Sequence, residues 1–351
     1  IVNIGLEGMM VIGTWFGAWA GWFYGPWYGV LAGLLGGALF GLIHAVGTIT
    51  FQVDHIVSGV AINILAAGVA RFLSVVAYAD VPAGGATQSP RVDERIEKIS
   101  IPYLSGGKIN ESDTADVFGS LEALDLFLIS DLFGLLGGLT RNISYFSILA
   151  ILLVPVSVWI LWSTSFGLQL RSVGEYPVGS ESVGVNVYLM KYIGVTISGA
   201  FAGLAGAYLV IESAGIYREG QTGGRGFIGL AAMIFGNWKP LGTFLGSSLF
   251  GYADSLQLRS EESVHGLLII IVCVLFIVGI RSFIKKNLRT AIVSFIFSGL
   301  FLFWFLNSST IPNEFVFFTP HITTLIVLSF ASQRLRMPKF IGKAYKKGEL
   351  N

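Results

Sequence analysis

Long apolar runs joined by short polar links make up most of this sequence. Seven of them approach the ~20 residues that a helix needs to cross a bilayer, at about 4–23, 26–46, 56–78, 145–162, 192–211, 264–280 and 291–306. A shorter run follows at 322–332, and two more, 227–235 and 241–253, are separated by a five-residue link. Because 227–235 is too short to span, it predicts a half-helix or one limb of a broken helix. The pattern predicts an all-α polytopic membrane bundle of about nine membrane segments, forming one domain over residues 1–351.

Three polar regions complete the pattern. Residues 79–144 contain ten acidic and five basic residues, and within them 121–139 mixes apolar positions with acidic ones. This stretch predicts an amphipathic helix at the membrane surface. Residues 163–191 form a polar loop between two apolar runs, and 334–351 form a basic tail. Since Lys and Arg collect on the cytoplasmic side, we expect the acidic region outside and the other two inside.

The composition agrees with a membrane protein. The chain is 54% hydrophobic and 12% charged, with a mean hydropathy of +0.73, which is too apolar for a soluble domain. Four of its glycines, Gly29, Gly33, Gly37 and Gly41, recur every four residues and predict a smooth face for close helix contact. The single cysteine, Cys273, lies in an apolar run and indicates neither a disulfide framework nor a metal site. The net charge of +1 gives no indication of nucleic-acid binding.

Two similar stretches of sequence suggest an internal repeat. Residues 4–10 read IGLEGMM and residues 228–234 read IGLAAMI, and each is followed by a proline and spaced glycines. The expected topology runs the first copy outward and the second inward, as in transporters whose substrate path lies between inverted repeats. The alternative is a chance likeness between Gly-rich apolar segments.

The polar loop 163–191 is built to stop and restart helices. Gly174 can end one helical run, and Pro177 can open the next because its fixed φ suits a first helical turn. Ser180 and Glu181 follow, ahead of further apolar positions. This loop is either a docking surface for a soluble cytoplasmic partner or an ordinary solvated loop.

Four blocks resemble the permease subunits of ATP-binding cassette (ABC) importers, in the nucleoside and simple-sugar branch of the branched-chain amino acid and ribose permease superfamily. They are NIGLEGMMVIG at 3–13, VSGVAINILAAG at 57–68, GLQLRSVGEYPVGSESVGVNVYLMKY at 167–192 and GIYREGQTGGRGFIGLAAMIFGNWKP at 215–240. The third block resembles the loop that couples these permeases to their ATPase. The resemblance assigns coupling to Arg171, Gly174, Glu175, Pro177, Glu181 and Gly184.

The resemblance also implies partners and a location. It implies an ABC ATPase subunit, a second permease subunit as a heterodimer partner, an external substrate-binding lipoprotein and a multi-pass place in the bacterial cell membrane. The chain begins without Met inside the first block, so we expect a preceding piece with another membrane segment.

The sequence lacks the usual enzymatic motifs. No G-x-x-x-x-G-K-[ST] phosphate loop occurs, since the Gly-Lys pairs at Gly107 and Gly342 are followed by Ile109 and Ala344. No H-E-x-x-H motif, Cys cluster or serine nucleophile elbow occurs either. We therefore expect a transport subunit without cofactor or metal of its own, energised by ATP that a partner binds.

A path for an uncharged polar solute should offer neutral hydrogen-bonding groups and aromatic faces. The candidates in or beside the apolar runs are Asn3, Glu7, Gln52, Asn63, Asn237 and Trp238. Glu7 either bonds polar groups across the repeat interface or faces the path, and Asn63 either cross-links helices or binds the solute. Trp238 is either an interfacial anchor or a stacking surface for a base. Nucleosides are the expected solute and simple sugars the alternative. An ion-coupled secondary transporter would need more buried carboxylates or histidines.

Overall fold

The computed structural model describes residues 2–109, 112–124, 129–256, 265, 267–308, 312 and 336–347. The chain divides into two compact units, the first made of Ile1–Ala231, Lys239–Leu241 and Met337–Asn351 and the second of Ala232–Trp238 and Gly242–Arg336. Five helical stretches among the described residues are long and apolar enough to cross a membrane: Pro26–Thr50, His55–Tyr78, Tyr145–Ser163, Val187–Ala214 and Leu288–Asn307. The predicted polytopic helical membrane bundle is confirmed.

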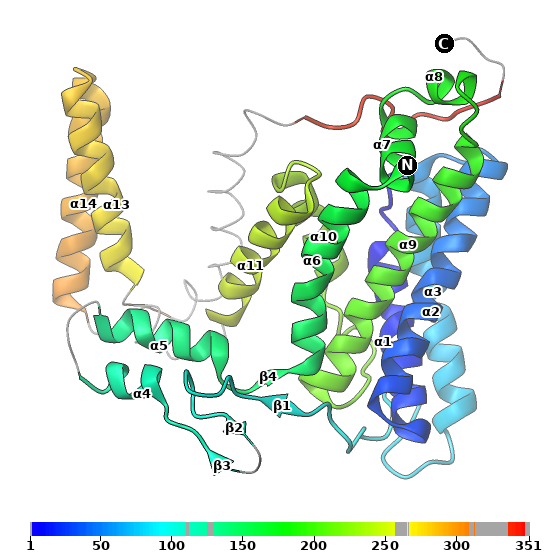
Figure 1. Ribbon diagram of the computed structural model, residues 1–351, viewed down its shortest axis with the longest axis horizontal. Coiled ribbons are helices and arrows are strands. Elements are labelled where there is room, and N and C mark those ends of the chain that lie inside the picture. The colour runs from blue at the N-terminus through cyan, green and yellow to red at the C-terminus, as the bar shows by residue number, and fades with distance from the viewer. Residues whose placement is uncertain are drawn as a thin grey trace. The chain divides into compact units, whose positions relative to one another are not determined.

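The first unit is built around α1 (Leu6–Tyr24), α2 (Pro26–Ala45) and α9 (Val187–Tyr208), which pack against one another, with α3 (His55–Tyr78) against α1 (Figure 1). Two π-helical turns extend this bundle, η1 (Val46–Thr50) after α2 and η2 (Leu209–Ala214) after α9. The apolar run predicted over 26–46 ends at the start of η1, but the helical path continues to Thr50. The Thr48 hydroxyl donates to the His44 carbonyl at 2.8 Å, so this polar residue is satisfied within the helix.

Glycine decides how closely these helices approach. A Cβ on Gly37 would lie 2.3 Å from the Gly199 carbonyl oxygen, and one on Gly203 would lie 2.2 Å from the Gly33 oxygen. Gly41 likewise faces the backbone of α9, and Gly29 faces that of α1. The predicted smooth face on α2 is confirmed, and this contact excludes any side chain larger than hydrogen.

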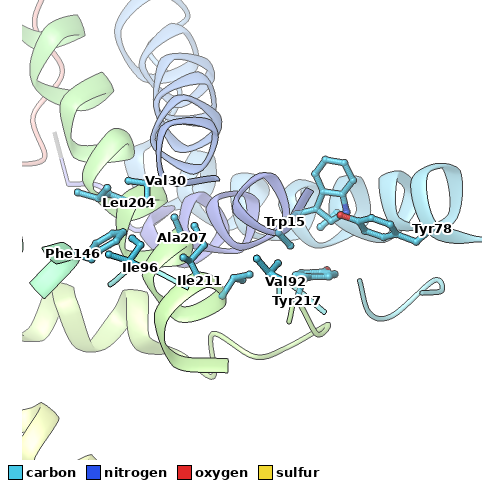
Figure 2. Close-up of a cluster of buried hydrophobic side chains, with 13 residues drawn as sticks. Trp15, Val30, Tyr78, Val92, Ile96, Phe146, Leu204, Ala207, Ile211 and Tyr217 are labelled. Carbon is cyan, nitrogen blue, oxygen red and sulfur yellow. The ribbon is translucent and has the colours of Figure 1, made fainter. Parts of the chain in front are cut away.

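A hydrophobic cluster fills one end of the first unit. Trp15 and Tyr78 lie together at one side of it, Ala207 and Ile211 lie in its middle, and Leu204 lies at the other side near Phe146 (Figure 2). The Trp15 indole donates to the Ser74 hydroxyl at 2.9 Å, so its one polar atom is paired inside the bundle.

The elements described within the region 79–144 are short. β1 (Lys98–Ile99) pairs antiparallel with β4 (Ile143–Ser144), and β2 (Lys108–Ile109) pairs with β3 (Ser112–Asp113). The single amphipathic helix predicted over 121–139 is wrong in its extent: α4 (Val117–Glu122) ends before a turn at 123–124, and α5 (Ile129–Thr140) follows. At 12 residues, α5 is about 18 Å long and cannot span a bilayer.

This region is tied to the stretch after η2. The Ser89 N–H donates to the Tyr217 carbonyl at 3.1 Å, and the Val92 N–H donates to the Gly215 carbonyl at 2.8 Å. Lys98 pairs with the largely buried Glu212 of η2 at 3.1 Å. The Gly-rich stretch from Gly215 is therefore held by backbone pairing to the residues around Ser89.

The other helices of the described residues follow the predicted apolar runs, apart from α7 and α8, which lie in the polar loop 163–191. They are α6 (Tyr145–Ser163), α7 (Ser165–Glu175), α8 (Pro177–Ser182), α10 (Arg225–Phe235) and α11 (Pro240–Leu256), then α13 (Leu267–Ile284) and α14 (Leu288–Asn307). In the second unit α13 and α14 pack side by side (Figure 1), and the Ser298 hydroxyl donates to the Val272 carbonyl at 3.1 Å. The predicted span 322–332 lies outside the described residues. The inverted repeat stays a prediction, because its second copy, 228–234, crosses from one unit to the other.

Candidate functional site

Residues 165–186 form a structured polar surface, called here the coupling surface after the role that the sequence resemblance predicts for it. α7 begins after Thr164, whose hydroxyl accepts a hydrogen bond from the Gly167 N–H at 3.1 Å. Tyr176 has φ −150° and ψ 84°, a conformation outside the α region that suits a residue before proline. α8 then begins at Pro177. The predicted interruption of the helix between Gly174 and Pro177 is confirmed.

Arg171 belongs to the inside of this surface. Its Nε donates to the Leu161 carbonyl at 2.8 Å, and its guanidinium carbon lies 5.3 Å from the ring centroid of Trp162. Both partners are on α6, so Arg171 fixes the joint between α6 and α7. Its side chain is therefore engaged by contacts within the chain itself.

The other five predicted coupling residues differ in their exposure to solvent and in their contacts. Glu175 and Gly184 are exposed, and Gly184 has φ +86°, a left-handed conformation that favours glycine. Pro177 is fully buried, whereas Gly174 and Glu181 contact the chain's C-terminal residues. The exposed apolar side chains of this surface, Leu168, Tyr176 and Val183, were not among the residues predicted to couple.

An apolar cluster supports the coupling surface from beneath. Val173, Val187 and Met190 are buried in it together with Tyr345. Asn186 caps α9 by accepting a hydrogen bond from the Leu189 N–H at 3.1 Å, so α9 begins five residues before the predicted run. The surface is therefore folded on a core of its own, unlike a solvated loop.

The carboxylate of Glu7, in the first turn of α1, holds the start of α10. Its Oε1 accepts hydrogen bonds from the Thr222 hydroxyl at 2.6 Å and the Gly224 N–H at 2.9 Å. Its Oε2 accepts one from the Gly226 N–H at 2.7 Å. A helix N-terminus favours negative charge, so the carboxylate is stabilised there. The geometry supports the bonding role of Glu7, since each oxygen is engaged by protein donors.

Asn63 and Asn3 also connect helices. Asn63 of α3 accepts from the Gly8 N–H at 2.7 Å and donates to the Ile4 carbonyl at 3.2 Å. Asn3 donates to the Ser198 hydroxyl of α9 at 2.9 Å, while its buried Oδ1 has no hydrogen-bond partner among the described residues. The structure thus brings Asn3, Glu7 and Asn63 together around the start of α1.

The other three candidates for the substrate path lie elsewhere. Gln52 is exposed, with φ +54°, in the turn before α3. Asn237 and Trp238 occupy the turn between α10 and α11 in the second unit, each with φ +55°. Asn237 accepts from the Arg336 N–H at 2.6 Å. Within the described residues, no group of three His, Cys, Asp or Glu side chains could hold a metal ion.

Sequence reasoning missed the partners of these side chains. Thr222 and Ser198 lie 215 and 195 residues from the groups they bond, Glu7 and Asn3. The Gly-rich stretch from Gly215 was the one available signal, because glycines let backbone N–H groups approach a carboxylate.

Residues 1–278 match the family described as branched-chain amino acid transport system / permease component. The guanosine ABC transporter permease protein NupQ of Bacillus subtilis is 35% identical over 356 residues, covering 99% of this chain and 89% of that protein. The nucleoside ABC transporter permease protein NupC of Lactococcus lactis is 31% identical with the same coverage of both chains. A provisionally named glucose ABC transporter permease protein of Haloferax volcanii is 29% identical over 75% of this chain and 70% of its own length. No solved structure matches the chain significantly.

Proposed function

Because the chain belongs to the family of branched-chain amino acid transport permease components, we propose that it is the membrane permease subunit of an ABC importer for nucleosides. The observation that carries this proposal is the near full-length similarity to two permeases named for guanosine and nucleosides. The more distant glucose permease supports simple sugars as the second candidate.

The polar groups near the start of α1 are consistent with an uncharged solute. Two of the three side chains gathered there are amides, and the single carboxylate, Glu7, is bonded to Thr222, Gly224 and Gly226. An amino acid would need groups for an ammonium and a carboxylate together. An ion-coupled transporter would need titratable groups that are open to the coupling ion, and Glu7 is already engaged.

Whole-cell uptake tests the substrate class. Uptake of a labelled nucleoside should require this chain and should be reduced by an excess of unlabelled purine or pyrimidine nucleosides. Glucose and branched-chain amino acids serve as matched competitors. Competition by glucose alone would favour the sugar alternative, and equal competition by amino acids would reject an uncharged solute.

We propose that the ATPase subunit docks on the coupling surface and supplies the energy, with no cofactor or metal held by the permease itself. A second permease as heterodimer partner and an external substrate-binding lipoprotein complete the importer. The support for docking is the exposed part of the coupling surface, where Glu175, Tyr176 and Val183 face solvent on a folded base.

Glu175→Lys and Val183→Glu test this docking. Each changes an exposed side chain without disturbing the buried cluster, so both variants should reach the membrane at normal levels. Purification of the tagged permease should then recover less ATPase, and uptake should fall with it. Arg171→Glu would be a poor probe, because it also breaks the joint with Leu161 and Trp162. Normal ATPase recovery with both variants would reject the docking site.

A further inference from the structure

The C-terminal residues return to the coupling surface. The segment 337–347, drawn in red in Figure 1, passes α7 and then α8. The Phe340 N–H donates to the Gly174 carbonyl at 3.1 Å. Pro338 lies beside the same glycine, with its Cβ 3.7 Å from where a Cβ on Gly174 would be. This basic segment, predicted to be a tail, is folded against a loop that precedes it by more than 150 residues.

Tyr345 is the anchor of this segment. Its side chain is only 6% exposed and belongs to the cluster with Val173, Val187 and Met190. The ring centroid of Tyr345 lies 5.5 Å from that of Tyr188. The Lys191 ammonium lies 5.1 Å from the Tyr345 centroid, within the range of a cation–π contact. A tyrosine buried on this scale contributes a large apolar area to the core beneath α8.

The hydroxyl of Tyr345 reaches the helix that presents the coupling surface. It hydrogen-bonds Oε2 of Glu181 on α8, and the Lys347 ammonium lies 4.0 Å from Oε1 of the same carboxylate. Burial, followed by the bond to Glu181, raises the pKa of Tyr345 to about 12, and the protonated phenol is the donor in this bond. The segment also reaches the start of α3, since Lys343 and Tyr345 line a small cavity with Lys191 and His55.

α8 needs such support. It has six residues, and helices of this length are not stable alone. Gly184 follows it, and a Cβ added there would meet no atom within 4 Å, so the turn after α8 is open. α8 is held by burial of the Pro177 and Ser180 side chains and by the hydrogen bond from Tyr345 to Glu181. The last of these is supplied by the C-terminal segment.

We propose that residues 337–347 are an integral third part of the coupling surface, and that Tyr345 is a positioning residue that holds α8 in the orientation the ATPase subunit recognises. This rests on the proposed function, which places the ATPase on that surface. Loss of Tyr345 should then weaken coupling although Tyr345 itself is buried and does not touch the partner.

A cysteine pair tests the geometry without reference to function. Disulfides favour Cβ–Cβ distances of about 3.5–4.5 Å, and the 3.7 Å separation of positions 174 and 338 falls in this range. In a Cys273→Ser background, Gly174→Cys with Pro338→Cys should give a disulfide-linked peptide pair by mass spectrometry after mild oxidation. Gly68→Cys with Pro338→Cys is the matched control and should give none. Failure of the first pair to link would overturn the placement of the segment.

Variants of Tyr345 test the role in the intact permease–ATPase complex. Tyr345→Phe keeps the ring and removes the bond to Glu181. It should lower the affinity for the ATPase about tenfold, the usual size for one lost hydrogen bond to a charged group. Tyr345→Ala should lower it further, and Lys339→Ala, at an exposed position of the same segment, should leave it unchanged. Hydrogen exchange of residues 177–184 should rise in the two tyrosine variants and stay normal in the lysine variant.

The two proposals fail in different ways. If Val183→Glu releases the ATPase but both tyrosine variants bind it normally, the docking site stands and the role of Tyr345 is rejected. If Val183→Glu and Glu175→Lys also bind the ATPase normally, the docking site itself is rejected. If Tyr345→Ala does not fold, the Tyr345→Phe affinity and exchange data decide the question.

Discussion

At the scale of single residues, Glu7 shows how an apolar segment can hold a carboxylate. It lies in the first turn of α1, and its two oxygens accept from Thr222, Gly224 and Gly226. A bare carboxylate in such a segment is costly, but donors at a helix N-terminus offset much of that cost. The sequence indicated that Glu7 must have polar partners. It could not indicate which ones, because contacts 215 residues apart follow from the packing of α1 and not from any local pattern.

Substitution of Glu7 should separate bonding from charge. Glu7→Ala leaves the buried Gly226 N–H and Thr222 hydroxyl without their acceptor, at a cost of about 1–3 kcal/mol for each unsatisfied group. Glu7→Gln keeps one acceptor oxygen and should be milder in both thermal stability and uptake. Thermal unfolding of the purified permease and nucleoside uptake measure the two effects. Normal stability and uptake in Glu7→Ala would show that the hydrogen bonds from Glu7 to the start of α10 are unimportant.

Asp116 offers a residue-scale test by pH. It caps α4 by accepting from the Gly119 N–H at 2.8 Å, and its other oxygen accepts from Arg141 at 2.8 Å. The Gly119 N–H and then the Arg141 guanidinium lower the pKa of Asp116. A lowered folded-state pKa stabilises the cap above the unfolded pKa of about 3.9, and this contribution is lost as pH falls through the folded value.

The cap should therefore persist from pH 7 to pH 5 and be lost below about pH 4. Hydrogen exchange of residues 112–124, corrected for its intrinsic pH dependence, should show α4 opening in that range. Asp116→Asn keeps a capping oxygen without the titrating charge and should show no such transition. The same transition in both proteins would assign it to another group.

At the scale of elements, the apolar runs predicted the long helices well and their ends less well. The run before Gly25 and the run after Pro26 became α1 and α2, because the proline suits a first helical turn. The extension to Thr50 was missed, since hydroxyl bonding to the preceding turn is invisible in hydropathy. The division of 121–139 between α4 and α5 was missed because it depends on contacts between side chains. Glu122 pairs with Arg141 at 3.4 Å, a contact that the acidic pattern alone does not reveal.

The contact of α2 with α9 should tolerate no added methyl group. A Cβ at Gly37 would lie 2.5 Å from the Gly203 Cα as well as close to Gly199, so the two helices must separate. Gly37→Ala should destabilise the protein by about 1–3 kcal/mol, the usual range for overpacking. Gly68→Ala on α3 meets no atom within 4 Å and should be neutral or slightly stabilising, since alanine favours helix. Thermal unfolding in detergent compares them, and equal midpoints would contradict the close contact.

At the scale of the whole molecule, the sequence predicted a multi-pass membrane protein with a structured polar loop. It did not predict that the C-terminal segment returns to that loop. The basic residues from Lys339 onward indicated only a cytoplasmic side, and a lone Tyr345 has no periodicity that would indicate burial. Its burial beside Val173, Val187 and Met190 depends on tertiary packing between segments far apart in the sequence.

The sidedness of the chain is the premise on which the coupling surface depends. The acidic region is expected outside, and the polar loop inside with the basic tail. Ser112, in β3, and Ser182, at the end of α8, are both exposed and report on these two regions. A cysteine replaces each of these serines in turn, in a Cys273→Ser background, because Cys273 is itself exposed.

An impermeant thiol reagent added to intact cells should label Ser112→Cys and leave Ser182→Cys unlabelled. After the cells are opened, both should react, which controls for reactivity of the two positions. An ATPase that uses cytoplasmic ATP can reach α8 only from the inside, so the labelling pattern decides whether docking there is possible. Labelling of Ser182→Cys in intact cells would invert the topology, and the docking site and the role of Tyr345 would then fall together.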